Sequence, residues 1–311
     1  MTATTTTTTP ASPGTTAKVI SVRPVVIPSS AGRGAELEVR VSAPVDGSAL
    51  PVVVFSHGFG SSMDGYGPLA NHWAAEGFVV VQPTHLDSSS LAVPPTDPRT
   101  PHIWRHRIDD LVAVLDHLDV VEAAIPGLSG RLDRDRIAVA GHSWGATTAS
   151  ALAGASVIGE RQGWKDDRVG AAVLLAIAGT GGEDLSPFAA EHFPFMNPEF
   201  AGLTTPSLVV GGDADQSMLS TRGPDWWTDA FRLAPGAEAL LTLHGAEHYL
   251  GGIHTFLSGH ELKPPMSAEL VEVVQGTSTA FLRHALGGDE AAWVDAQREV
   301  AARTAARVDV K

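Results

Sequence analysis

Residues 136–150 read RIAVAGHSWGATTAS, and the turn at their centre decides the fold. An apolar, β-branched run leads into Gly141-x-Ser143-x-Gly145, and a run of small residues typical of a closely packed helix follows. A nucleophile held on a sharp strand-to-helix turn needs small neighbours, because larger side chains would collide there. The start of the helix adds partial positive charge, which favours a developing oxyanion. The stretch therefore predicts Ser143 as a nucleophile, with an ordinary packed turn as the alternative.

Strand patterns alternate with helical patterns along the rest of the chain. Continuous apolar runs are typical of strands buried on both faces of a sheet. They predict strands at 51–58, 78–83, 136–141, 171–179, 206–212 and 239–245, and two segments rich in β-branched residues on either side of a turn predict strands at 18–27 and 36–44. Apolar residues at 3–4-residue spacing predict helices at 66–77, 104–124 and 266–307, the last broken near Gly287 and Gly288. We expect an α/β fold with a mostly parallel, twisted sheet of about eight strands and helices on both faces. The first two strands form an antiparallel pair around the turn SSAGRG.

Composition limits the possible partners and the location of the protein. The 311 residues carry a net charge of −14, so nucleic acid and anionic membranes are unfavourable partners. The sequence includes no cysteine, which excludes disulfides, thiolate metal sites and a cysteine nucleophile. The sequence contains no run of about 20 consecutive apolar residues, so it predicts no membrane span. Residues 1–17 are rich in threonine and predict a disordered tail before a single catalytic domain at 18–311. The N-terminus lacks the pattern of a secretory signal, and we expect a cytoplasmic protein.

A serine nucleophile requires a base, and position must choose among the 13 histidines. The stretch HGAEHYLGG follows the predicted strand 239–245 directly, in a glycine-bearing loop at the sheet edge. Reactive groups gather outside the carboxyl ends of parallel strands, which favours His248 as the base. His244 and His254 are the alternatives.

The base in turn needs a carboxylate that orients its ring. GDADQS follows the predicted strand 206–212 and offers two aspartates. Asp215 leaves room for the chain to turn back toward the sheet, whereas Asp213 lies in the turn itself and is better suited to cap it. We therefore favour Asp215 as the acid.

Backbone N–H groups that could stabilise an oxyanion are predicted at two further places. Trp144 directly follows the nucleophile, and its N–H lies at the start of a helix. The stretch SHGFG at 56–60 ends an earlier strand, and its glycines would allow the Phe59 N–H to turn inward. We call SHGFG at 56–60 the HG loop. Four features, namely the HG loop, Ser143, an aspartate and His248, thus each follow a predicted buried strand.

At this point the chain resembles the α/β-hydrolase superfamily, whose triad follows the order Ser, Asp, His. The resemblance covers about residues 36–285. Within that superfamily, the chain most resembles the bacterial esterases near the dienelactone hydrolases, chlorophyllases and platelet-activating-factor acetylhydrolases. This narrower match rests on VVVFSHGFGSS, LANHWAAEGFVVVQPTHLDSSS, RIDDLVAVLDHL, AGHSWGA and TAFLRHALGGD.

The resemblance implies a serine esterase that cleaves a small-molecule carboxylic ester through an acyl-enzyme. By position it carries over Ser143, Asp215 and His248 as the triad, with Phe59 and Trp144 as backbone oxyanion donors. It requires no metal and no organic cofactor. An acyltransferase or a lyase that uses the same triad, or a non-catalytic binding protein on this fold, are the alternatives.

The segment 180–206 is too short for a large cap, so we expect an open site. Its predicted walls are 180–206 and the loop 84–104. Aromatic residues of these segments are expected to line a substrate pocket or else to pack locally: Trp104, Phe188, Phe193 and Phe195. Trp226 and Trp227 are expected on a helix that packs on the sheet, with one of them partly exposed.

Overall fold

The computed structural model describes residues 17–160, 163–254, 256–257, 260–261 and 266–311. The predicted tail at 1–17 lies outside this part of the chain, apart from Ala17.

Nine of the described strands form one sheet, and its centre is parallel. In spatial order they are β1 (Val19–Ile27), β2 (Leu37–Pro44), β4 (Val79–Pro83), β3 (Leu50–Ser56), β5 (Leu132–His142), β7 (Val169–Leu175), β9 (Ser207–Gly212), β10 (Ala237–Leu243) and β13 (Ala306–Val310). The six strands from β4 to β10 run parallel, and β1 and β2 form the antiparallel pair that was predicted. This mostly parallel sheet confirms the predicted α/β-hydrolase fold.

The ninth strand was not predicted. β13 pairs antiparallel with β10 at the sheet edge, and its first two residues fall in the segment 266–307 that the sequence pattern predicts to be helical. Its five residues, ARVDV, alternate apolar and polar side chains, so they lack the continuous apolar run by which the central strands are identified. An edge strand is covered less fully than a central one and needs no such run.

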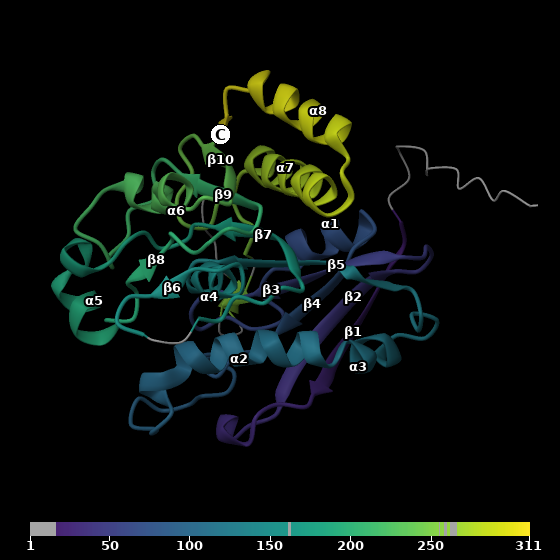
Figure 1. Cartoon of the computed structure of the whole chain (residues 1–311), viewed down its shortest axis with the longest axis horizontal. Helices are drawn as coiled ribbons and strands as arrows, with labels where there is room; N and C mark the ends of the chain where they lie inside the picture. The colour runs from purple at the N-terminus through teal and green to yellow at the C-terminus, as the bar shows by residue number, and fades with distance from the viewer. Residues whose placement is uncertain (1–16, 161–162, 255, 258–259, 262–265) are drawn as a thin grey trace, which may run out of the picture.

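Helices cover both faces of the sheet (Figure 1). Val52 and Val54 of β3 pack into one apolar layer with α2 (Ile103–Asp116) and α4 (Trp144–Leu152). Val53 and Phe55 pack into the other with α1 (Gly67–Ala75) and α7 (Ala268–Gly287). Alternation of side chains along a strand places neighbours on opposite faces, which is why these strands are apolar throughout. α8 packs on the outer side of α7 (Figure 1).

The helices have the following bounds: α1 Gly67–Ala75, α2 Ile103–Asp116, α3 Leu118–Ala124, α4 Trp144–Leu152, α5 Pro187–His192, α6 Asp229–Leu233, α7 Ala268–Gly287 and α8 Glu290–Ala301. Short 3₁₀ turns are η1 Ala31–Arg33, η2 Thr100–His102, η3 Gly182–Asp184 and η4 Pro224–Thr228. Two small ribbons pair β6 (Ser156–Val157) with β8 (Pro198–Glu199) and β11 (Phe256–Leu257) with β12 (His260–Glu261).

Of two predictions about the helices, one needs adjustment and the other is confirmed. The expected helix at 104–124 is two helices, because His117 leaves helical geometry and its N–H turns back to the Val114 carbonyl. The break near Gly288 is confirmed, with Gly288 in the left-handed conformation that commonly ends a helix. No large cap is formed by the described residues 180–206, which hold only η3, α5 and β8.

The expected exposure of one of the two neighbouring tryptophans was wrong. Trp226 and Trp227 lie on η4 and are 0% and 3% exposed. Each indole N–H donates to a backbone carbonyl, Trp226 to Thr180 at 2.7 Å and Trp227 to Asp215 at 3.1 Å. Because both polar groups are satisfied, neither ring needs contact with water.

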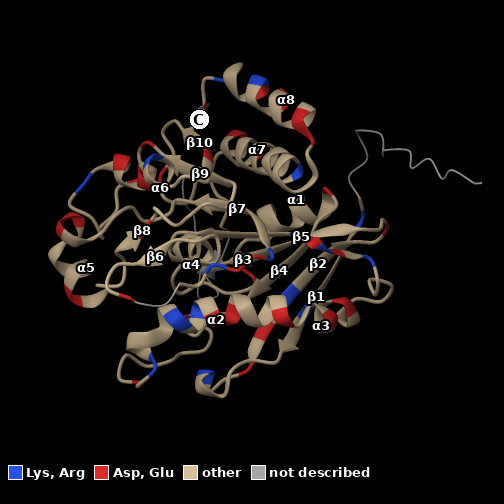
Figure 2. Ribbon diagram, viewed as in Figure 1, with Lys and Arg blue, Asp and Glu red and all other residues tan. Residues whose placement is uncertain are grey.

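Acidic residues occur on the ribbons of α2, α3, α5 and α8, and basic residues lie beside them on α2 and α8 (Figure 2). Acidic side chains are therefore distributed over several elements of the described structure. Within the described part of the chain, no helix has both the length and the apolar composition needed to cross a membrane.

Candidate active site

Ser143 lies at the sharp turn between β5 and α4. Its φ is +56° and its ψ is −124°, a conformation that costs free energy in any residue except glycine. The backbone N–H of Ser143 donates to the Leu175 carbonyl of β7 at 2.9 Å, and the carbonyl of Ser143 accepts from Ala146 in the first turn of α4. The turn is thus held by both the sheet and the helix.

Gly141 and Gly145 allow this turn to pack closely. Neither has a positive φ, so their role is space and not backbone conformation. A Cβ on Gly141 would overlap the Gly145 carbonyl, and a Cβ on Gly145 would overlap the Ser56 carbonyl at the end of β3. The start of α4 therefore lies directly against the start of the SHGFG loop.

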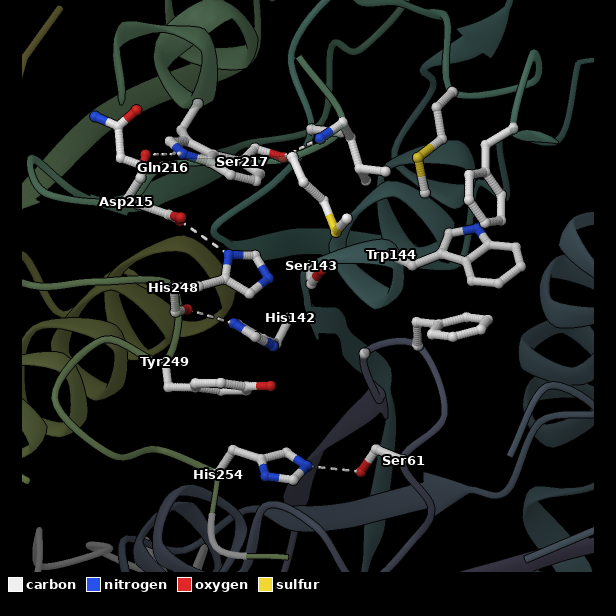
Figure 3. Close-up of a pocket in the computed structure, with 18 of the residues that line it drawn as sticks. Ser61, His142, Ser143, Trp144, Asp215, Gln216, Ser217, His248, Tyr249 and His254 are labelled. Carbon is white, nitrogen blue, oxygen red and sulfur yellow. Dashed lines mark hydrogen bonds and ion pairs between the residues drawn. The ribbon is translucent and has the colours of Figure 1, made fainter. Parts of the chain in front are cut away.

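Asp215 and His248 are joined by a hydrogen bond. His248 Nδ1 lies 2.9 Å from Asp215 Oδ2, and the Asp215 side chain is 1% exposed. With the Nδ1 proton directed to the carboxylate, Nε2 keeps its lone pair, and this nitrogen points toward Ser143 (Figure 3). No hydrogen bond joins Ser143 to His248 among the described residues.

The alternative residues make different contacts: Asp213 and His244 lie outside the cavity of the candidate site, whereas His254 lines it. Asp213 is 46% exposed; its carboxylate contacts His244 Nδ1 at 2.8 Å and accepts the Gly245 N–H at 2.7 Å. Asp213 therefore caps the turn that ends β10, and His244 pairs with it there. His254 contacts Ser61 Oγ at 2.9 Å.

A chain of hydrogen bonds connects the HG loop to the backbone of His248. The Gly58 N–H donates to the Tyr66 hydroxyl at 3.0 Å, and this hydroxyl lies 2.8 Å from His142 Nδ1. His142 Nε2 lies 2.8 Å from the His248 carbonyl, which can only accept. His142 is therefore protonated at Nε2 and accepts at Nδ1. Burial, followed by repulsion from His248, holds the pKa of His142 well below 6.5, so the ring is neutral.

Several backbone groups on either side of Phe59 are hydrogen-bonded. The Gly60 N–H donates to Asp87 Oδ2 at 3.0 Å, and the Gly60 carbonyl accepts from the N–H and hydroxyl of Ser89. The His57 carbonyl accepts from Arg107. These bonds fix the loop on both sides of the Phe59 N–H. The Trp144 N–H has no acceptor within its own helix, because it belongs to the first turn of α4.

A buried ion pair lies beneath this loop. Arg107 contacts Asp87 at 2.6 Å, and both side chains are at most 2% exposed. The Arg107 guanidinium also lies 4.8 Å from the centre of the Trp144 ring. Burial raises the pKa of Asp87, but the charge of Arg107, the two nearby histidines and the Gly60 N–H outweigh it, so the net pKa is lowered. The Asp87 carboxylate is therefore ionised and holds Gly60 through a charge-assisted hydrogen bond.

Ser143, Asp215 and His248 line one cavity of about 530 Å³, together with Phe59 and Trp144 (Figure 3). Its walls were only partly predicted. Residues 188, 193 and 196 of the segment 180–206 line it, but the second wall is 215–219, and nothing from 84–104 lines it. Of the four aromatic residues considered, Phe188 and Phe193 line the cavity, while Trp104 and Phe195 stack behind Trp144.

Four residues around this site make hydrogen bonds that the sequence did not predict: Tyr66, Asp87, Arg107 and His142. Asp87 lies four residues after the end of β4 and Asp215 three residues after the end of β9, so the strand-end rule could have found Asp87. Arg107 lies three residues after Trp104 and four before Leu111, on the apolar stripe of α2, where a charge implies a buried partner. Nothing in the sequence indicates the Tyr66–His142 contact.

Comparison with known families agrees with the fold. The chlorophyllase family model matches residues 14–161, a little under half of the chain. The matched segment includes SHGFG and Ser143, while Asp215 and His248 lie beyond it. The predicted resemblance to chlorophyllase-like α/β-hydrolases is confirmed, and the match supports an ester-cleaving hydrolase in general terms.

The close packing of the turn predicts a large effect for Gly145→Ala. The new methyl group overlaps backbone atoms of β3, so we expect a loss of about 3 kcal/mol or more in the free energy of unfolding, measured by urea denaturation. Gly276→Ala is the matched control, since Gly276 is an exposed helical glycine with nothing within 4 Å of an added Cβ. It should stabilise the protein by about 0.5–1 kcal/mol. Equal effects of the two substitutions would contradict the packing argument.

Four buried histidines predict acid sensitivity: His57, His85, His142 and His254. Burial lowers the pKa of each, that of His254 to about 4, so the folded protein keeps them neutral. The unfolded chain protonates them below pH ~6.5, so this stability is complete above pH ~6.5 and is lost as the pH falls. Each contributes a slope of about 1.4 kcal/mol per pH unit. Burial raises the pKa of Asp110 to about 6, which offsets one histidine.

Urea denaturation at pH 7, 6 and 5 measures this slope. His254→Gln should reduce it by about 1.4 kcal/mol per pH unit between pH 6 and 5, because one proton fewer is taken up on unfolding. His102→Gln, at an exposed position, should leave the slope unchanged. An unchanged slope in His254→Gln would show that His254 is charged in the folded protein.

Proposed function

We propose that this protein hydrolyses carboxylic esters through an acyl-enzyme formed on Ser143, with His248 as general base and Asp215 as its orienting acid. One observation carries the proposal: Ser143, at φ +56° on a strand-to-helix turn, shares a cavity with a histidine that is hydrogen-bonded to a buried aspartate. This is the constellation that a serine nucleophile requires.

In the first half of the reaction, the Ser143 oxygen attacks the carbonyl carbon of the ester while His248 Nε2 takes the hydroxyl proton. The carbonyl oxygen becomes an oxyanion. His248, now positively charged and stabilised by Asp215, returns the proton to the alcohol oxygen as the bond from carbon to that oxygen breaks. The alcohol leaves, and the acyl group remains on Ser143.

In the second half, water takes the place of the alcohol. His248 accepts a proton from the water as its oxygen attacks the acyl carbon, and returns it to the Ser143 oxygen as that bond breaks. The carboxylic acid leaves and the free serine is restored.

The N–H groups of Phe59 and Trp144 are the proposed donors to the oxyanion. The bonds that hold His57, Gly58 and Gly60 support this role, because donors that are already fixed need no rearrangement as the charge develops. The Arg107–Asp87 pair contributes indirectly, since it contacts the loop that carries one donor and the ring of the residue that carries the other.

The buried position of Asp215 Oδ1 also supports the proposal. This oxygen has no hydrogen-bond partner among the described residues, and Oδ2 bonds to His248, so the one side-chain hydrogen bond of the carboxylate within the described structure is the one to His248. The rings of Trp227 and His142, with centres 5.2 and 4.8 Å from that of His248, limit the orientation of the imidazole.

Ser143→Ala tests the nucleophile. Removal of the attacking oxygen should lower the rate of p-nitrophenyl butyrate hydrolysis by about 10⁴-fold or more, while the thermal unfolding curve stays close to that of the wild type. Ser62→Ala, a serine outside the cavity lining, is the matched control and should retain full activity. Retention of a tenth of the wild-type rate by Ser143→Ala would rule out Ser143 as the nucleophile.

The two aspartates after β9 provide an internal comparison for the acid. Asp215→Asn should reduce kcat by about 10²- to 10⁴-fold, since the amide favours the wrong His248 tautomer and cannot stabilise the imidazolium. Asp213→Asn should change kcat less than about threefold, because Asp213 contacts only the turn at the end of β10. The opposite ranking would move the acid to Asp213.

A further inference from the structure

The cavity has two unlike sides. Figure 3 shows Trp144 to the right of Ser143, and Tyr249, His254 and Ser61 below it. The side of Trp144 is apolar and continues with Phe193, whose ring contacts that of Trp144, and with Phe188 beside it. Met196, Met218 and Leu219 add further apolar lining to the cavity. The other side carries hydroxyl and imidazole groups.

Ser61 and His254 form a buried pair on the polar side. Ser61 Oγ lies 2.9 Å from His254 Nε2, and the residues are 2% and 1% exposed. The second ring nitrogen of His254, Nδ1, is buried and has no hydrogen-bond partner in the described part of the chain. The ring centres of Tyr66 and Tyr249 lie 4.6 and 5.5 Å from that of His254. The pair is thus fixed in place with hydrogen-bonding capacity left over.

The remaining capacity has a definite chemistry. If Ser61 donates to Nε2, the spare groups are the Nδ1 proton and the Ser61 lone pairs. If Nε2 donates to Ser61, the spare groups are the hydroxyl proton and the Nδ1 lone pair. In both cases the pair offers one donor and acceptor capacity. A ligand hydroxyl, which is itself both a donor and an acceptor, matches either arrangement.

The charge of the cavity excludes ionised ligand groups at this place. Burial lowers the pKa of His254 to about 4, so its ring carries no charge near neutral pH. No lysine or arginine is among the described residues that line the cavity, and Asp215 is its one carboxylate, already bound to His248. A carboxylate or an ammonium group would therefore lose its water without gaining a charged partner.

The position of the pair indicates which part of an ester it would meet. His248 must return its proton to the departing alcohol oxygen, so the alcohol leaves on the side of His248. Tyr249 follows His248 directly, and His254 belongs to the same loop. The alcohol part therefore extends toward the polar side, and the acyl part toward Trp144.

We propose that Ser61 and His254 form a subsite for a hydroxyl group on the alcohol part of the ester. The preferred substrates are then neutral esters with an apolar acyl chain and a hydroxylated alcohol, such as a glycol or glycerol ester. This proposal rests on the proposed ester hydrolysis at Ser143.

The test compares two series of hexanoate esters, matched in length, in which the alcohol part ends in a hydroxyl group in one series and in a methyl group in the other. One series contains the 2-hydroxyethyl, 3-hydroxypropyl and 4-hydroxybutyl esters, and the other the propyl, butyl and pentyl esters. The release of hexanoic acid is followed by titration at constant pH. The full-length wild type should prefer the hydroxylated ester by about five- to tenfold in kcat/KM for at least one chain length, which corresponds to one added hydrogen bond.

Variants then assign the preference to the pair. Ser61→Ala and His254→Phe should each bring the ratio of the two kcat/KM values close to one, and His254→Gln, which keeps hydrogen-bonding groups, should restore part of it. Ser62→Ala should keep the wild-type ratio. If His254→Phe fails to fold, Ser61→Ala decides alone, because it removes a single hydroxyl.

Two outcomes would overturn the proposal: equal kcat/KM values in both series for the wild type at every length, or an undiminished preference in Ser61→Ala. Hydrolysis of the alkyl esters by the wild type, abolished in Ser143→Ala, keeps the proposed function in either case. No hydrolysis of any of the six esters would reject the proposed function itself.

Discussion

The contact between the start of α4 and the end of β3 is the constraint on which the site depends. Gly145 lies so close to the Ser56 carbonyl that no side chain fits between them. This contact joins the turn that holds Ser143 to the loop that carries Phe59, two segments far apart in the sequence. The strained backbone of Ser143 persists because the Leu175 carbonyl and the first turn of α4 hold it from both sides. The proposed nucleophile and the proposed oxyanion donors therefore have one fixed relative position.

Polar groups buried around this contact extend its effect. Arg107 and Asp87 bind the HG loop from below, and Tyr66 and His142 connect that loop to the backbone of His248. Burying an ion pair is costly unless further hydrogen bonds satisfy it, and here Arg107 also bonds to Thr148 and to Ser56. Two side chains of the cavity lining each hold a buried atom without a partner among the described residues, Asp215 Oδ1 and His254 Nδ1. The first belongs to the proposed triad, and the second suggests where a substrate hydroxyl would bind.

Much of this fold could be predicted because its central strands are continuous apolar runs, each covered on both faces. β13 could not, since an edge strand of alternating residues has no such run. The positions of Ser143, Asp215 and His248 came from one rule, that reactive groups follow parallel strands, and the structure brings these residues to one cavity. The walls could not be predicted, because loop conformation depends on contacts between distant segments, such as Asp87 with Arg107. The catalytic roles of Ser143, Asp215 and His248 are our proposal.

The central claim is that Ser143 is uniquely activated, and covalent labelling tests it most directly. A fluorophosphonate reacts with a serine that an adjacent base has activated, so treatment of the intact protein followed by peptide mass spectrometry reports which serine has reacted. The account predicts a single adduct, on Ser143, that is absent in Ser143→Ala and strongly slowed in His248→Gln. Labelling of another serine, or no labelling of a folded wild-type protein, would contradict it.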